Sequence, residues 1–414
     1  MTISPISTTL LSIISCSLFY KESVKIINLN LVELLEEAKK QAVFPLAFSV
    51  IKKEAQLCLD NKTFSDYYQL YMEMIISNTQ NFADHDELNE ILSKNHISYC
   101  ILKGFSSAAY YPCPCLRTMG DVDFLINKKD AEQVQDILKK LGFVSDDKIL
   151  KGYHIAYYRE NRSIWELHCG INGVPKNPVG VAIEKEIQSI YETALIHEID
   201  SFQCMIPDRY HHGLIILLHT VAHLTHEGIG LRHLCDWASF VNTFENNDFE
   251  KMFKIKLKSF GLWKFAVILT KLCVEYLGMP NQDWINDSNC LNAETSNLLK
   301  RLIQDIMNSG NFGSKDFNRY REIKYIANED KTVDSKRLLP QLFSSLNYKV
   351  YYNHKIIDRN RILLPIGWII ESFKYIILLA TRKRKINNTK KMFIEASQRK
   401  VLYNEFDLFK TRYE

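Results

Sequence analysis

The segment Gly120-Asp-Val-Asp-Phe-Leu-Ile126 constrains the fold more than any other part of the sequence. Its alternation of charged and apolar residues predicts a half-buried β-strand over residues 121–126. Asp121 and Asp123 are two residues apart, so both carboxylates point to the same face of that strand. The apolar residues between and after them point to the opposite face, into a core.

Short elements surround this strand and predict its sheet. The expected elements are strands at residues 97–102, 153–159 and 163–169, the last two forming a hairpin, and a helical turn at 106–111. Asp130 and Gln133 fit a capping box at the start of a helix, and Gly142 is expected to end that helix. The order of elements predicts an α/β (α+β) fold with a small mixed β-sheet.

Helical patterns flank the sheet on both sides. Asn30 is expected to cap one helix, and residues 86–93 to form another short one. Further helices are expected at residues 213–226, 233–244 and 262–277. The expected regions are an N-terminal helical region (1–95), the sheet core (96–200), a helical domain (201–345) and a basic amphipathic tail (346–414).

Composition restricts the class of protein. The net charge of +4 is too small to predict specific nucleic-acid binding. The ten cysteines form no Cys-x-x-Cys pair, and Cys113 and Cys115 are separated by one proline, which is poor spacing for structural zinc. Scattered thiols of this kind indicate a reduced, cytoplasmic protein.

Two apolar segments raise the question of a membrane. Residues 10–19 contain Ile13-Ile-Ser-Cys16, which formally resembles a lipoprotein cleavage site, but residues 1–9 contain no Lys or Arg, so a buried first helix is favoured. The tail from Ile362 to Lys385 contains Pro365 and several charges, which disfavour a spanning helix. It fits either a helix at the inner-membrane interface or one packed on the protein body.

The paired aspartates suit phosphate chemistry. Two carboxylates a few ångströms apart repel each other, and a divalent cation such as Mg²⁺ or Mn²⁺ removes that cost. A third carboxylate is expected on a neighbouring strand, where Glu166 shares a face with His168. Glu166 could complete the metal site or act as a general base, and His168 could orient a substrate or form a simple hydrogen bond.

A phosphate cradle is expected nearby. Gly104 stands at a strand-to-helix junction, where a glycine lets the backbone approach phosphate closely. Lys103 adds a charge, and Ser106 or Ser107 adds a hydroxyl. Arg117 is a further candidate because its guanidinium can bind phosphate with two donors.

Together these motifs resemble a known family. The chain is similar to the uncharacterised bacterial nucleotidyltransferase family of the polymerase-β-like superfamily. The resemblance rests on Ile101-Leu-Lys-Gly104, Tyr111-Pro112, Arg117, residues 120–126, Leu141-Gly-Phe143, Glu166-Leu-His168, His219, His223 and Leu234-Cys-Asp236. It implies that Asp121 and Asp123 bind Mg²⁺, that Gly104 and an adjacent serine bind the triphosphate, and that Glu166 is the third carboxylate. In this sequence Phe105 separates Gly104 from Ser106, a departure from the superfamily's usual Gly-Gly or Gly-Ser.

Several histidines and one aspartate remain as candidates outside this motif. His219 and His223 share a helix face and can bind zinc, but Thr220 stands where a His-Glu-x-x-His motif has glutamate. Helix packing or a wall facing the substrate is therefore favoured for them. Asp236 is expected to contact the nucleotide or acceptor, or to bond Arg232 or His233.

The expected function is transfer of a nucleoside monophosphate from a nucleoside triphosphate to an acceptor of unknown identity. A sugar of a surface polysaccharide, a peptide or another small molecule would serve as acceptor. The alternatives are a non-catalytic nucleotide- or partner-binding protein that has kept the fold, and a peripheral membrane scaffold organised by the tail.

Overall fold

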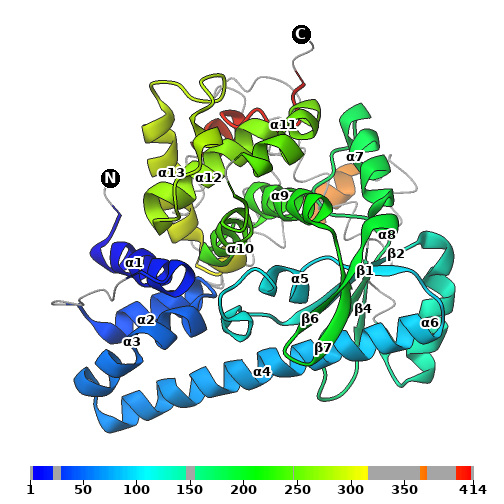
Figure 1. Ribbon diagram of the computed structural model, residues 1–414, viewed down its shortest axis with the longest axis horizontal. Helices are drawn as coiled ribbons and strands as arrows, with labels where there is room; N and C mark the ends of the chain where they lie inside the picture. Colours follow the sequence, from blue (N-terminus) through cyan, green and yellow to red (C-terminus); the bar gives the residue numbers. More distant parts are fainter. Residues whose placement is uncertain are drawn as a thin grey trace. The chain divides into compact units, whose positions relative to one another are not determined.

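The computed structural model describes residues 3–21, 29–145, 154–245, 247–315, 364–370 and 398–411. Its contacts divide the chain into two units: Met1–Leu224 with Gly228–Lys315 and Phe406–Glu414, and Thr225–Glu227 with Asp316–Glu405. The sheet and the helices around it belong to the first unit (Figure 1). The four regions expected from the sequence stay a prediction.

The first unit contains a mixed sheet of five strands. Its strands are β1 (Tyr99–Ile101), β2 (Asp121–Ile126), β3 (Val144–Ser145), β4 (His154–Tyr158) and β5 (Ile164–His168), in the order β1-β2-β5-β4-β3. Only β2 and β5 run parallel, and the other neighbours are antiparallel. The predicted strand at residues 121–126 and the predicted hairpin are confirmed, and so is the α/β class.

The apolar face of the sheet is buried as the alternation predicts. Val122 and Phe124 on β2, and Trp165 and Leu167 on β5, are almost completely buried in one core cluster. A separate antiparallel hairpin, β6 (Leu195–Ile199) with β7 (Phe202–Ile206), also contributes to that core. The polar face of β2 and β5 is thereby left for the acidic residues.

Helix α4 (Asn61–Lys94) is the longest element and corrects one expectation. Residues 86–93 are the last part of this 34-residue helix rather than a separate short one. The helix packs against β7, beside which it runs in Figure 1, and also against β2. Its buried polar residues interrupt any apolar repeat, and three of them, Asn78, Asn81 and Asp84, have hydrogen-bond partners outside the helix. Asn78 donates to the carbonyl of Cys115, and Asp84 accepts from the backbone N–H of Ser163.

The start of α6 (Ala131–Lys140) also differs from expectation. Asp130 lies in a short 3-10 turn (Lys128–Asp130) with helical backbone angles, and its side chain caps nothing. The predicted capping box is therefore wrong, because a capping residue needs an extended backbone to turn its side chain onto the free N–H groups. Gly142 ends the helix in a left-handed conformation, as expected.

Helices precede and follow the sheet. Besides α4, those before it are α1 (Pro5–Phe19), α2 (Leu31–Lys40) and α3 (Phe44–Cys58). Those after it are α7 (Pro178–Gln188), α8 (Ile190–Thr193), α9 (Arg209–His226), α10 (Leu231–Val241), α11 (Asp248–Ser259), α12 (Trp263–Leu277) and α13 (Thr295–Ser309). The buried first helix and the Asn30 cap are confirmed. Helices α7, α11 and α13 and the β6–β7 hairpin were not expected from the sequence.

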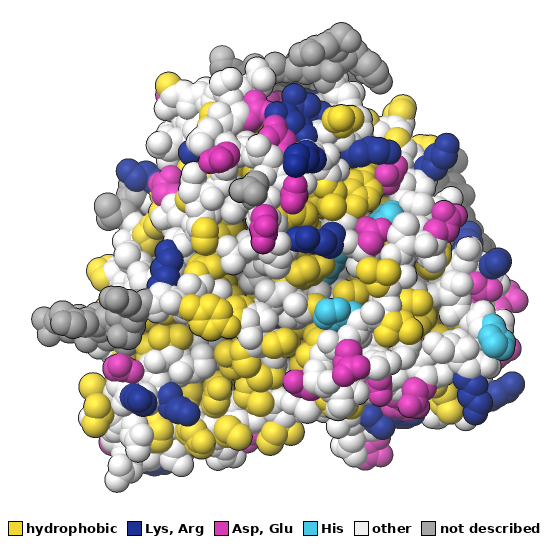
Figure 2. All heavy atoms as spheres, viewed as in Figure 1, with side chains coloured by type: hydrophobic (Ala, Val, Ile, Leu, Met, Phe, Trp, Pro, Cys, Tyr) yellow, Lys and Arg dark blue, Asp and Glu magenta, His cyan; other side chains and the backbone are white. Residues whose placement is uncertain are grey.

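The surface mixes charges of both signs. Lys, Arg, Asp and Glu side chains are interspersed on the face shown in Figure 2, in keeping with the net charge of +4. Apolar side chains gather there at lower left, where Figure 1 places α1 to α4. The exposed large apolar residues of α3 and α4 are Leu57, Tyr68, Met72 and Ile76.

Within the described residues, no helix combines the length and apolar character that crossing a bilayer requires. Of the tail segment 362–385, only residues 364–370 are described, and they are helical. The rest of that segment lies outside the described residues, so its contact with a membrane stays a prediction.

Candidate active site

Parallel pairing of β2 and β5 brings the acidic residues together. Asp123 lies in register with Glu166, and Leu125 with His168. The side chains of Asp123, Glu166 and His168 each offer a ligand atom, and these atoms lie within 4.8 Å of one another. Asp121 is half-buried on the same face of β2. The sheet thus gathers three carboxylates and one imidazole at one place.

Asp123 is the most constrained of these groups. Its side chain is only 1 % exposed, and its Oδ1 accepts from Lys103 Nζ and from His168 Nε2, both at 2.9 Å. Burial alone would raise the pKa of Asp123, but the charges and hydrogen bonds of Lys103 and His168 outweigh burial and hold that pKa well below its usual range. Asp123 is therefore ionised.

Among the residues that the structure describes, the second carboxylate oxygen of Asp123 has no partner. Oδ2 is buried and makes no hydrogen bond. A buried acceptor without a partner is costly, so such an atom usually meets an ion, a water or a ligand. With Glu166 beside it, this oxygen fits a divalent cation, because Mg²⁺ and Mn²⁺ prefer carboxylate oxygens.

The two aspartates affect each other as the sequence predicts. Burial raises the pKa of Asp121, and the negative charge of Asp123 raises it further, although Lys103 opposes both effects. Burial would lower the pKa of Lys103, but Asp123 and Asp121 together raise it, so Lys103 carries its charge. Ionising both aspartates is thus opposed, and a bound cation would favour it.

The loop expected to cradle phosphate is built around Gly104. Helix α5 (Phe105–Ala108), which follows it, is a single turn. Ser106 is fully buried and its hydroxyl donates to the carbonyl of Ile101 at 2.9 Å. Ser107 is also buried, 3.4 Å from the ring of His212. Both hydroxyls therefore have partners inside the protein, and their contact with phosphate stays a prediction.

Gly104 adopts backbone angles that only glycine tolerates, φ +63° and ψ −107°. A Cβ there would lie 3.2 Å from the ring of His85, which is fully buried. We expect Gly104→Ala to lower the free energy of unfolding by about 1–3 kcal/mol, measured by chemical denaturation. Gly120→Ala is the control, because no described atom beyond its two chain neighbours lies within 4 Å of its Cβ position. Equal stability of both variants would contradict the predicted strain.

Arg117 and Asp236 form a buried ion pair. The guanidinium donates from Nε and Nη2 to the two carboxylate oxygens at 2.8 Å each, and Tyr111 donates to the same carboxylate at 2.6 Å. Asp236 was expected to bond Arg232 or His233, but its hydrogen-bond partners are Arg117 and Tyr111. Since Nε and Nη2 of Arg117 already donate to Asp236, a contact of Arg117 with phosphate stays a prediction.

His85 and Asn81 were not expected from the sequence. Asn81 on α4 donates to the backbone carbonyl of Asp121 at 3.3 Å, and His85 lies against Gly104 with its Nδ1 2.7 Å from the carbonyl of Asn81. Burial lowers the pKa of His85 to about 4, so the ring is neutral. In the sequence, these two residues show only a polar pair at helical spacing. Such a pattern is usually interpreted as a solvated helix face, so it does not point to a site.

A second group of histidines lies on α9 and α10. His219, His223 and His233 each offer a nitrogen, and these nitrogens lie within 4.8 Å of one another. The pKa of His219 lies well below its usual value, because of burial, the charge of Lys103 and the neighbouring histidines. The pKa of His233 is likewise well below its usual value, because of burial, His223 and Arg232. The sequence pattern pairs His219 with His223, but not with His233.

Residues 29–278 contain the whole sheet and its carboxylates, and they match the model of a family described as uncharacterised nucleotidyltransferase. The match covers more than half of the chain. The chain belongs to this family. The resemblance noted from the motifs is thereby confirmed, and membership supports nucleotidyltransferase activity in general. No curated protein matches the chain.

Proposed function

We propose that this nucleotidyltransferase moves a nucleoside monophosphate from a nucleoside triphosphate to an acceptor. The nucleophilic atom of the acceptor forms a bond to the α-phosphorus, the α–β phosphoanhydride bond breaks, and pyrophosphate leaves. The acceptor's proton passes to a base. The observation that carries this proposal is the buried, unpartnered Oδ2 of Asp123 beside Glu166, within a chain of this family.

The proposed metal ligands are Asp121, Asp123 and Glu166, with Mg²⁺ or Mn²⁺ as the ion. When bound, the ion would neutralise phosphate charge and orient the triphosphate. Lys103 supplies a second positive charge at the same place, since its Nζ lies 2.9 Å from Asp123 and its side chain is 22 % exposed. His168 orients the Asp123 carboxylate through its hydrogen bond.

The phosphate-binding role is proposed mainly for Lys103 and the Gly104 backbone. Gly104 lies next to Lys103 and lets the chain approach an anion closely. Ser106, Ser107 and Arg117 support this loop through the hydrogen bonds they make inside the protein. Catalysis would then come mostly from positioning and charge neutralisation.

Metal-dependent nucleotide binding tests this function without knowledge of the acceptor. Calorimetric titration with ATP, GTP, CTP and UTP, each with Mg²⁺, Mn²⁺ or EDTA, should show at least one triphosphate that binds. Its affinity should fall at least about tenfold in EDTA, because an ion held by Asp121, Asp123 and Glu166 would neutralise charge on the phosphates. Failure of every triphosphate to bind under all three conditions would overturn the proposal.

The variant Glu166→Gln separates the two roles open to this residue. As a metal ligand, Glu166 would be needed for metal-supported binding, so the variant should require roughly ten to a hundred times more Mg²⁺ for the same nucleotide affinity. As a base alone, it would leave the Mg²⁺ requirement unchanged. The register with Asp123 favours the first result. Glu132→Gln, on the exposed side of α6, is the matched control.

A further inference from the structure

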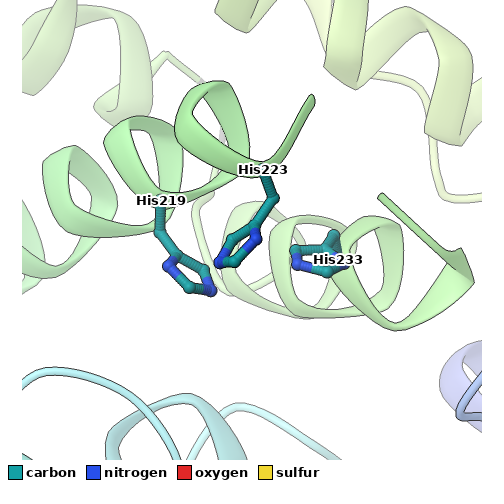
Figure 3. Close-up of side chains that lie close together, drawn as sticks. All are labelled: His219, His223 and His233. Atoms are coloured by element: carbon teal, nitrogen blue, oxygen red, sulfur yellow. The ribbon is translucent and has the colours of Figure 1, made fainter. Parts of the chain in front are cut away.

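Three histidines from two helices converge on one point. His219 and His223 lie one turn apart on α9, and His233 lies near the start of α10; Figure 3 shows the three rings side by side between the helices. Their ring centroids are 4.3 to 5.6 Å apart. One nitrogen of each ring lies within 4.8 Å of one nitrogen of both others.

Packing alone does not account for His233. Its side chain is buried, with 2 % of the residue exposed, and neither Nδ1 nor Nε2 has a hydrogen-bond partner in the described part of the chain. A histidine that only fills a core normally satisfies its ring nitrogens, because a buried polar atom left unpaired is costly. Two unpaired nitrogens on one buried ring, beside two other imidazoles, indicate a missing ligand.

Space for a ligand lies beside two of the three rings. A small cavity with room for about one water molecule is lined by His219 and His233 together with Lys103 and Asp236. Phe312 packs against His223 and His233, with ring centroids 4.7 and 5.4 Å away. An aromatic cover of this kind limits solvent access to a metal.

We propose that His219, His223 and His233 bind one Zn²⁺ ion, separately from the carboxylates of β2 and β5. Imidazole nitrogens select zinc and related transition metals, whereas Mg²⁺ selects oxygen ligands. Three nitrogens around tetrahedral zinc lie about 3.4 Å apart, given Zn–N bonds of about 2.1 Å. Small side-chain rotations bring the observed separations of up to 4.8 Å to that value. Three protein ligands leave the fourth position to water or a substrate oxygen.

Zinc binding by the purified full-length chain tests this site. The background variant Asp121→Asn with Asp123→Asn weakens the competing carboxylate site, and excess Mg²⁺ occupies what remains of it. After chelation, reloading with Zn²⁺ and dialysis, elemental analysis should find one Zn²⁺ per chain in that background. X-ray absorption should show imidazole nitrogens at about 2.0–2.1 Å. Failure to retain zinc, or a zinc shell without imidazole, would overturn the proposal.

Single substitutions identify the ligands. His223→Asn and His233→Asn, each in the same background, should weaken zinc binding by roughly a hundredfold or more, since even residues that only support a ligand are worth about tenfold to a hundredfold. His96→Asn is the matched control, because His96 is exposed and has a positive φ that Asn tolerates. Circular dichroism shows which variants fold, and His219→Asn replaces any that do not. Unchanged zinc affinity in the folded variants would refute the assignment.

Discussion

Replacing Asp121 and Asp123 together by Asn is expected to reduce nucleotidyl transfer by at least about a thousandfold, which corresponds to about 4 kcal/mol of transition-state stabilisation. Each carboxylate would lose the negative charge that attracts the cation. The unpartnered Oδ2 of Asp123 would be replaced by part of an amide group, and an amide binds Mg²⁺ more weakly. Pyrophosphate release from the triphosphate that binds the wild-type protein, measured with an acceptor that supports turnover, is the readout.

A matched variant separates loss of chemistry from loss of structure. Asp136→Asn changes an exposed aspartate on α6 that is not among the proposed metal ligands, so its turnover should equal that of the wild type. Circular dichroism should show that the double variant keeps its helical content, because Lys103 and His168 can still donate to the amide carbonyl oxygen that would replace Oδ1 of Asp123. Turnover within tenfold of the wild type would contradict the proposed metal site.

The variant Asp236→Asn is expected to lower the free energy of unfolding by about 3–5 kcal/mol, because it leaves a buried guanidinium without its counter-charge. The Arg117 side chain is only 4 % exposed and that of Asp236 only 12 %, so water cannot replace the lost partner. Denaturant unfolding at pH 7 measures the change. A loss under about 1 kcal/mol, typical of an exposed ion pair, would contradict this assignment.

The same pair sets a pH dependence of stability. Burial would raise the pKa of Asp236, but Arg117 outweighs burial and lowers it. A lowered pKa in the folded state contributes stability that is fully present above the unfolded value, about pH 4, and is lost as the pH falls through the folded value. The wild type should therefore lose part of this stability in acid, and Asp236→Asn should not. Arg117→Met with Asp236→Leu should recover much of the loss, since it leaves no unpaired charge.

Local sequence patterns were sufficient for the elements that carry the residues of the proposed site. Alternation of polar and apolar residues predicted β2 and the β4–β5 hairpin, because a strand with one buried face needs a repeat of two. The spacing of Asp121 and Asp123 predicted their shared face for the same reason. These statements depend only on neighbouring residues, so no knowledge of the rest of the chain was needed.

Where local patterns failed, a distant partner had compensated for an unfavourable residue. The polar side chains of Asn78, Asn81 and Asp84 hid the length of α4, because such residues normally mark a solvated face. In the fold they bond the backbone at Cys115, Asp121 and Ser163. The helix therefore continues through them and positions the loop and strand that carry the aspartates.

The sequence by itself determined a strand with two carboxylates on one face, a glycine junction before it and a hairpin bearing Glu166. Tertiary structure alone decided that β5 pairs in parallel with β2, which sets Glu166 beside Asp123. It also decided that Arg117 pairs with Asp236 and that His233 joins His219 and His223. The register of strand pairing and the packing of helices depend on which apolar surfaces of distant segments are buried together. A local sequence repeat does not specify those contacts.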